Sequence, residues 1–182
     1  PKWISKQLGV KSFLTPLGSS PGSRNNRQPI SFASYRKRIF CASCNEHFKH
    51  VEDRAIPLLV PMARGRTLSL GPESQDVLAL WAAKTGIALI SAMAETADIV
   101  PEEHRKSVRL DGSPHPNMWV GIFYWNGGPV AAADQTSYPT SAESIETRTV
   151  YRALLAFRNF GFCVAGVDDL PGDGRAIGGE PG

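Results

Sequence analysis

The sequence of 182 residues predicts an α+β fold, in which helices come first and a small antiparallel sheet of about four strands follows. Apolar residues recur at spacings of three and four between residues 44 and 94, which indicates helices that bury one face. Residues 118–167 instead contain short aromatic and β-branched runs separated by turn residues, which indicates strands. The length fits one domain, or a small domain with an appendage.

Local composition divides the first 44 residues into short segments. Residues 1–9 are typical of a short helix that ends at Gly9, because glycine accepts the left-handed conformation that closes many helices. Residues 12–34 are rich in Ser, Pro, Gly, Asn and Arg and predict an exposed loop. A basic strand over residues 35–40 should then lead into a helix that begins near Cys44.

Prolines set the expected limits of the two main helices. Pro57 and Pro61 should break the helix that begins near Cys44, because a proline inside a helix removes a hydrogen bond. The clearest helix begins at Pro72, which suits a first helical turn, and runs to about residue 94. A short polar helix should follow over residues 101–107.

The inward stripe of the clearest helix contains one aromatic residue and one lysine. Its members are Val77, Leu80, Trp81, Lys84, Thr85 and Ala88. We expect Trp81 to lie in the core, with the Lys84 stem alongside it and the ammonium group in water.

The strands are expected as two hairpins. Residues 118–125 and 129–133 should form the first, around the turn residues Asn126-Gly127-Gly128. Residues 145–157 and 159–167 should form the second. The residues expected inside this part of the core are Trp119, Phe123 and Cys163.

The charge is divided unevenly along the chain. Residues 1–66 contain 12 basic and 3 acidic residues, a net charge of +9, whereas residues 67–182 contain 8 basic and 14 acidic residues, a net charge of −6. These values indicate a basic module over 1–66, a helix-and-strand domain over 67–170 and a disordered tail over 171–182. The basic module suits a polyanionic partner; the alternative is that it docks on the acidic half of its own chain.

Three cysteines are an odd number for a disulfide framework and fit a reducing, cytoplasmic setting. No apolar run is long enough to span a membrane, and residues 1–20 have no signal-peptide pattern. We therefore expect a cytoplasmic protein without a membrane partner. The sequence also has no phosphate-binding glycine-rich loop that would indicate a small-molecule cofactor.

The segment Cys41-Ala42-Ser43-Cys44-Asn45 is the most informative for chemistry. Two thiolates at this spacing, between a strand and a helix, can both face one zinc ion and form half of a tetrahedral site. The other ligands must come from elsewhere. One alternative adds His47 and His50, which would crowd four ligands into about one and a half helical turns. A second cysteine pair before Pro1 would avoid that strain.

The order of Pro-Lys-Trp at residues 1–3, a variable loop, a basic strand and Cys41-X-X-Cys44-Asn45 resembles HNH-type endonucleases. It is most similar to a group in which a cysteine pair and an acidic-His dipeptide precede the Pro-Lys-Trp-like segment. The resemblance covers about residues 1–90. It also includes Phe48, Val51, Glu52, Pro57, Pro61, Gly65 and the run from Trp81 to Thr85.

The resemblance implies a ββα-metal (treble-clef) remnant at the front of the chain. It also implies that Cys41 and Cys44 bind structural zinc and that Asn45 is a catalytic residue, which helps to hold a Mg or Mn ion. In such modules a histidine acts as general base toward water, while the ion neutralises charge on the phosphodiester.

In the HNH-type endonucleases that this sequence resembles, the general-base histidine and its acidic neighbour come before the Pro-Lys-Trp-like segment. Here they would therefore precede Pro1. The chain starts without Met, so we expect a fragment that lacks part of the active site. The expected activity of the intact protein is metal-dependent hydrolysis of DNA phosphodiester bonds. Two alternatives are a non-catalytic zinc-binding module that binds DNA or another protein, and a structural protein whose basic front docks on its own acidic half.

Five basic residues are candidates for contacts with DNA phosphates. They are Arg24, Arg27, Arg36, Lys37 and Arg38. Flexible basic side chains beside a zinc-stapled helix could bind a backbone without reading sequence, although a merely soluble loop has the same composition. The aromatic cluster Trp119, Phe123, Tyr124 and Trp125 could stack on bases, but strand alternation favours burial of Trp119 and Phe123.

Overall fold

The structure is a computed structural model and describes residues 2–15, 28–31, 42–93, 99–139 and 147–168. The helical segments are α1 (Lys2–Leu8), α2 (Ala42–Ala63), α3 (Pro72–Met93), α4 (Glu102–Lys106) and a π-helical segment η1 (Ser107–Asp111). The strands are β1 (Ser12–Thr15), β2 (Gln28–Ser31), β3 (Met118–Tyr124), β4 (Val130–Pro139), β5 (Thr147–Phe157) and β6 (Phe160–Val167). The α+β prediction is therefore confirmed at this level.

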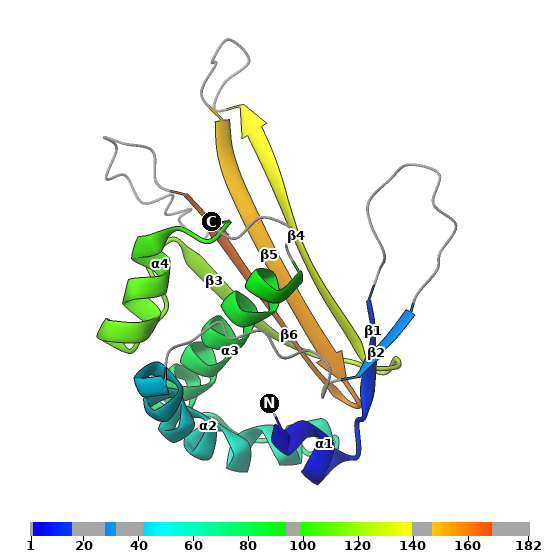
Figure 1. Ribbon diagram of the computed structural model, residues 1–182. Helices are drawn as coiled ribbons and strands as arrows, with labels where there is room; N and C mark the ends of the chain where they lie inside the picture. The colour runs from blue at the N-terminus through cyan, green and yellow to red at the C-terminus, as the bar shows by residue number, and fades with distance from the viewer. Residues whose placement is uncertain (1, 16–27, 32–41, 94–98, 140–146, 169–182) are drawn as a thin grey trace, which may run out of the picture.

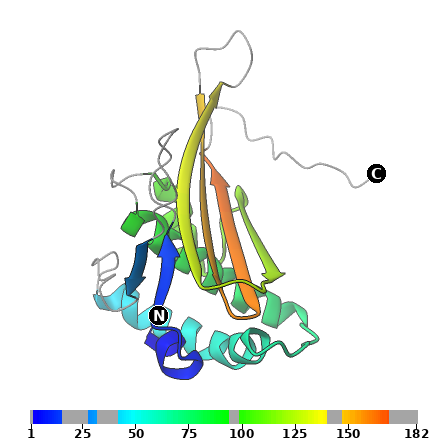
Figure 2. The same cartoon turned by 90° about the vertical axis from the view of Figure 1, so that its right-hand side faces the viewer.

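The strands form one six-stranded sheet in the order β2-β1-β4-β5-β6-β3 (Figures 1 and 2). Its larger part, β4-β5-β6-β3, is the expected four-stranded antiparallel sheet. The hairpin β1–β2 joins the edge of this part, because β1 pairs in parallel with β4 at Leu14 and Val130. Short strands thus occupy residues 12–15 and 28–31 of the segment 12–34, which we had expected to be loop throughout.

The pairing of β3 corrects the sequence prediction. We expected β3 to form a hairpin with the next strand, but it pairs with β6, while β4 pairs with β5. The predicted β5–β6 hairpin is confirmed, with Arg158 at its turn in a left-handed conformation (φ 54°). Strand β6 is buried at Phe160, Phe162 and Val164, and a central position gives it a neighbour on each side. Burial, rather than the glycine-rich turn after β3, decided the pairing.

Helix α2 runs through Pro57 and Pro61, so the predicted break is wrong. The helix places a continuous apolar stripe against the core. The buried members of this stripe are Phe48, Val51, Ala55, Leu59 and Ala63. Burying these side chains offsets the hydrogen bonds that the two prolines remove, because each large apolar side chain contributes about 1.5–3 kcal/mol when it leaves water.

Helix α3 covers one face of the sheet and confirms the predicted core position of Trp81 (Figure 1). The Trp81 side chain is fully buried, and its ring lies 5.0 Å from that of Phe162 and 6.1 Å from that of Trp3. Gly86 lets the helix approach β6, because a Cβ atom there would lie 2.9 Å from Val164. The tryptophan and the glycine together set the separation of helix and sheet.

The opposite face of the sheet is more open than the sequence predicted. Cys163 is exposed, and 49% of the Trp119 surface is accessible, so the prediction that both are core residues is wrong. Both side chains alternate with residues that face α3, and in the described part of the chain no helix is shown to cover their side. Phe123 is half-buried because its ring lies over Gly161, where a Cβ would be 2.4 Å from the ring.

None of the helices in the described segments combines the length and the apolar character that crossing a bilayer requires.

Candidate functional site

The first turn of α2 contains two of the residues that the sequence singled out. Cys44 is half-buried and packs against the core one turn before Phe48, whereas Asn45 is exposed. A helix start suits a thiolate ligand, because the positive end of the helix dipole favours negative charge. The turn therefore presents a sulfur donor toward the protein body and an amide beside it toward solvent.

The segments before this turn occur in the order of a ββα unit. The antiparallel hairpin β1–β2 precedes α2 in the chain, as a ββα arrangement requires. The hairpin is held at the edge of the large sheet, by the pairing of β1 with β4. Residues 32–41, which connect β2 to α2, lie outside the described residues, and the treble-clef packing stays a prediction.

Within the described segments no three His, Cys, Asp or Glu side chains lie close enough together to hold a metal ion. Cys41 lies outside these segments. His47 and His50 are both exposed on α2, and the His47 ring packs at 5.6 Å against Phe48. The zinc half-site at Cys41 and Cys44 and the Mg or Mn ion at Asn45 therefore stay predictions.

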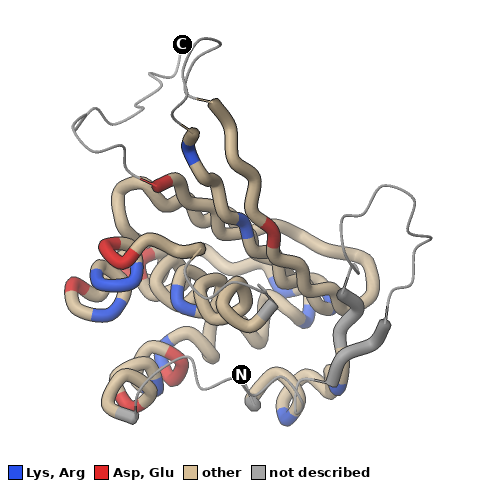
Figure 3. The backbone as a smooth tube through the Cα atoms, turned by 45° about the horizontal axis from the view of Figure 1, so that its top comes forward, with Lys and Arg blue, Asp and Glu red and all other residues tan. Residues whose placement is uncertain are grey.

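The five basic residues predicted to contact DNA all lie outside the described residues. They are Arg24, Arg27, Arg36, Lys37 and Arg38. The described residues 2–15 nevertheless include three lysines and no acidic residue. In Figure 3 the helix α1 has blue positions and no red ones, whereas α2 and α4 carry both signs of charge.

A second group of polar side chains lies between α4 and β5. His104 is fully buried, and its Nδ1 lies 2.7 Å from the hydroxyl of Tyr151. The His115 ring stacks on His104 at 4.3 Å. Burial raises the pKa of Tyr151 well above its ordinary range, and the nearby charge of Glu103 adds to the effect. These contacts attach α4 and the segment after it to the sheet.

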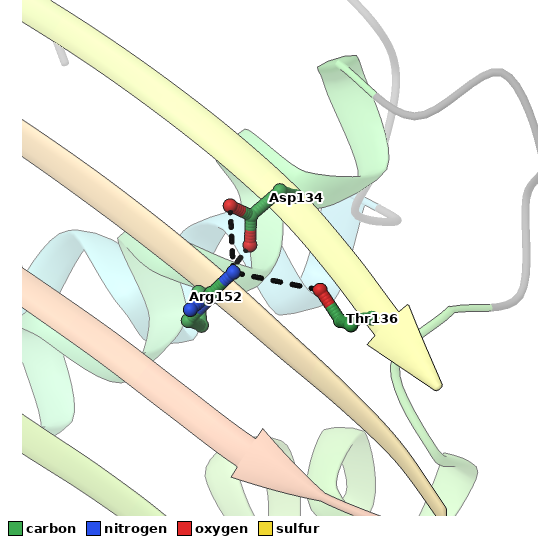
Figure 4. A network of polar contacts seen from close by, with 3 residues as sticks. All are labelled: Asp134, Thr136 and Arg152. Carbon is green, nitrogen blue, oxygen red and sulfur yellow. Dashed lines mark hydrogen bonds and ion pairs between the residues drawn. The ribbon is translucent and has the colours of Figure 1, made fainter. Parts of the chain in front are cut away.

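A third polar group lies on the sheet face turned away from α3 (Figure 4). Arg152 on β5 donates from Nε to Asp134 Oδ1 at 2.8 Å and from Nη2 to Oδ2 at 3.1 Å, and Nη2 also contacts the Thr136 hydroxyl at 3.5 Å. The hydrogen bond and the charge of Asp134 both raise the pKa of Arg152. This bidentate pair links two neighbouring strands and satisfies the guanidinium locally.

The sequence did not indicate the contact that Arg158 makes, and the prediction that the Lys84 ammonium lies in water is wrong. Arg158 donates a hydrogen bond from Nε to the carbonyl oxygen of Leu8 at 2.8 Å, although 150 positions separate the two residues. Lys84 is buried and paired with Glu52, so its ammonium group does not lie in water as we expected. A lysine on the inward stripe of α3 was a signal for a buried partner, but nothing in the local sequence indicates the contact of Arg158.

Comparisons with known proteins found no family model, no curated protein and no solved structure that matches this chain.

Proposed function

We propose that this chain is part of an HNH-type, metal-dependent DNA endonuclease. The proposal is supported above all by one observation: Cys44 and Asn45 occupy consecutive positions in the first turn of a helix that follows a β-hairpin, with Cys44 half-buried and Asn45 exposed. A half-buried cysteine suits a structural ion, whereas an exposed residue at the next position lies where an ion could also contact substrate.

The roles of the residues follow from their chemistry. Cys41 and Cys44 would supply two of the four ligands of a structural zinc ion, which fixes the start of α2. Asn45 would then hold the catalytic divalent ion, which neutralises charge on the phosphodiester when bound. The site would also need two further zinc ligands and a general base, which Cys41, Cys44 and Asn45 do not supply.

The charge of the chain supports DNA as the substrate. Residues 1–66 carry a net charge of +9, and they include the proposed zinc ligands and the hairpin. An excess of positive charge in this part of the sequence would attract the polyanion, and affinity would fall steeply with salt because binding releases counterions.

The test uses the longest natural reading frame that contains this chain. Metal analysis of the purified protein should find zinc, and Cys44→Ser should lose it, whereas Cys163→Ser should retain it because Cys163 is exposed on the sheet. Plasmid nicking in Mg or Mn should fall at least about 100-fold in Asn45→Ala. Asn126→Ala, which changes an exposed asparagine in the β3–β4 connection, should nick normally.

The outcomes separate the proposal from its rivals. Zinc with salt-sensitive DNA binding but no nicking would favour a non-catalytic zinc-binding module. The proposal would be overturned if the purified protein contains no zinc and its Asn45→Ala variant nicks DNA as fast as the unsubstituted protein. Zinc-free protein with no salt-sensitive affinity for DNA would favour the structural role, in which the basic front docks on the acidic half of the chain.

A further inference from the structure

A hollow lies where the end of α1 meets the β3–β4 connection and the β5–β6 turn. Its volume is about 500 Å³, and its walls come from the segment Gly9–Ser12, from Gly127 and Pro129, and from Arg158. The three walls are far apart in the sequence, and the pairing of β1 with β4 brings them to one end of the sheet (Figure 1). The hollow is therefore a product of the tertiary fold.

Arg158 is held in a defined position at this hollow. Its left-handed backbone (φ 54°) turns the chain between β5 and β6, and its Nε donates to the last carbonyl of α1 at Leu8. A guanidinium has five N–H donors, and this bond uses one of them. In the described part of the protein the other four have no hydrogen-bond partner. The group is thus oriented in advance, with donors available for a ligand.

The charge of the hollow is positive and unbalanced. Lys11 is its second cationic residue, and the lining residues include no acid. Neither Lys11 nor Arg158 forms an ion pair in the described segments, in contrast to Lys84 and Arg152. Ser12 also lines the hollow, and a serine hydroxyl can donate a hydrogen bond. Two cations on a concave wall suit a tetrahedral oxyanion, because charge-assisted hydrogen bonds to phosphate oxygens are strong.

We propose that this hollow binds a backbone phosphate of DNA, with Arg158 and Lys11 as its main contacts. The proposal rests on the proposed function for its choice of ligand, and it names a contact point that the sequence did not indicate. A polynucleotide is favoured over a free anion because the hollow adjoins residues 2–15, which contain three lysines and no acid. Guanidinium and ammonium groups would position the duplex without reading its sequence.

The experiment measures binding of a fluorescent DNA duplex as a function of salt concentration. In Lys11→Ala the slope of log K against log salt should become shallower, and it should become shallower by about 0.9 in total when Arg158→Gln is added, because the hollow binds one phosphate and each phosphate contact contributes about 0.9 to the slope. Lys6→Ala is the matched control, since Lys6 is an exposed lysine of α1 that does not line the hollow. It should change the slope less than Lys11→Ala does, because Lys6 adds to the surrounding positive charge without lining the hollow.

Two measurements keep the result clear. Thermal unfolding of each variant tests folding, and Lys11→Ala serves as the main variant because its exposed side chain makes no contact that α1 needs, unlike that of Arg158. Inorganic phosphate and a mononucleotide are titrated as competitors. The concentration of each competitor is expressed as total phosphate and compared with that of the DNA. If either competitor displaces the duplex at an equal phosphate concentration, the hollow binds free anions and the proposal is overturned.

A Lys11→Ala slope equal to that of Lys6→Ala would also overturn the proposal. Its failure can be told from that of the proposed function. If the protein binds zinc and nicks DNA but Lys11→Ala does not change the salt slope, the nuclease proposal is supported and the phosphate site is contradicted. If Lys11→Ala makes the slope shallower but the protein neither binds zinc nor nicks DNA, the phosphate site is supported and the nuclease proposal is contradicted.

Discussion

Lys84 on α3 and Glu52 on α2 form an ion pair across the interface of the two helices, although 32 positions separate them in the chain. The Lys84 side chain is only 10% exposed and the Glu52 side chain 26%. The Lys84 ammonium also lies 5.7 Å from the centre of the Phe48 ring, one turn from Glu52 on the same helix. The pair thus holds the helix that carries Cys44 and Asn45 against the core of the protein.

Glu52→Gln should destabilise the protein by about 3 kcal/mol, because the ammonium of Lys84 would stay buried without its counter-charge. Urea unfolding measures this loss. Glu73→Gln is the control, since Glu73 pairs with Arg54 between the same two helices but both side chains are largely exposed, at 87% and 59%. It should cost at most about 1 kcal/mol. Equal losses in the two variants would contradict a structural role for the buried pair.

Gly166→Ala should destabilise the protein by about 1–3 kcal/mol, because overpacking forces neighbouring groups out of place. Gly166 pairs with Tyr151 across β5 and β6, and a Cβ atom would lie 2.2 Å from the Tyr151 ring. Gly128→Ala meets no atom within 4 Å and should change stability little. Chemical denaturation compares the two. A neutral Gly166→Ala would show that the Tyr151 ring can move without loss.

Tyr151 should make stability depend on alkaline pH. Burial raises its pKa above the ordinary value of 10.0, and the charge of Glu103 acts in the same direction. The folded state therefore favours the protonated phenol, so its contribution is complete below pH 10.0 and is lost as the pH rises toward the raised pKa. The loss should approach about 1.4 kcal/mol for each pH unit within that window.

Tyr151→Phe provides the comparison for this pH dependence. The variant should lose about 1 kcal/mol at neutral pH, since the phenol no longer bonds His104, and its stability should fall less steeply above pH 10.0. Urea unfolding at a series of pH values gives both quantities. Identical alkaline slopes in the two proteins would show that other groups cause the dependence.

Pro57→Ala should stabilise the protein by about 1 kcal/mol or more, because a proline inside a helix costs up to about 3 kcal/mol relative to alanine. Pro57 is inside α2 and exposed, so the change removes little packing. Pro72→Ala tests the same substitution at the first residue of α3, where proline costs the helix nothing, and it should give no gain. A gain at both positions, or at neither, would contradict this account.

Local sequence was sufficient for most of the elements. The limits of α3, the short helices α1 and α4, and the β5–β6 hairpin follow from spacing and turn residues, and the structure agrees with them. These features depend on neighbours within a few positions, so periodicity and turn chemistry contain the necessary information. The burial of Trp81 was predictable for the same reason.

The candidate site was only partly readable from sequence. Cys44 and Asn45 could be singled out by their spacing, and the structure describes both at the start of α2. Arg158 could not be found this way, because its relation to Leu8 depends on a strand pairing between distant segments. Cys41 and the five basic residues of the predicted DNA contact lie outside the described residues, and their roles stay predictions.

The sequence by itself determined where the chain is helical and extended, and where its basic residues are concentrated, because these properties arise from each residue and its near neighbours. The tertiary structure alone decided that β3 pairs with β6, that α2 continues through its prolines, and that Lys84 meets Glu52. Each of these outcomes is set by burial in a shared core. The free energy of burying a helix face or a central strand exceeds the local preferences of a turn or a proline.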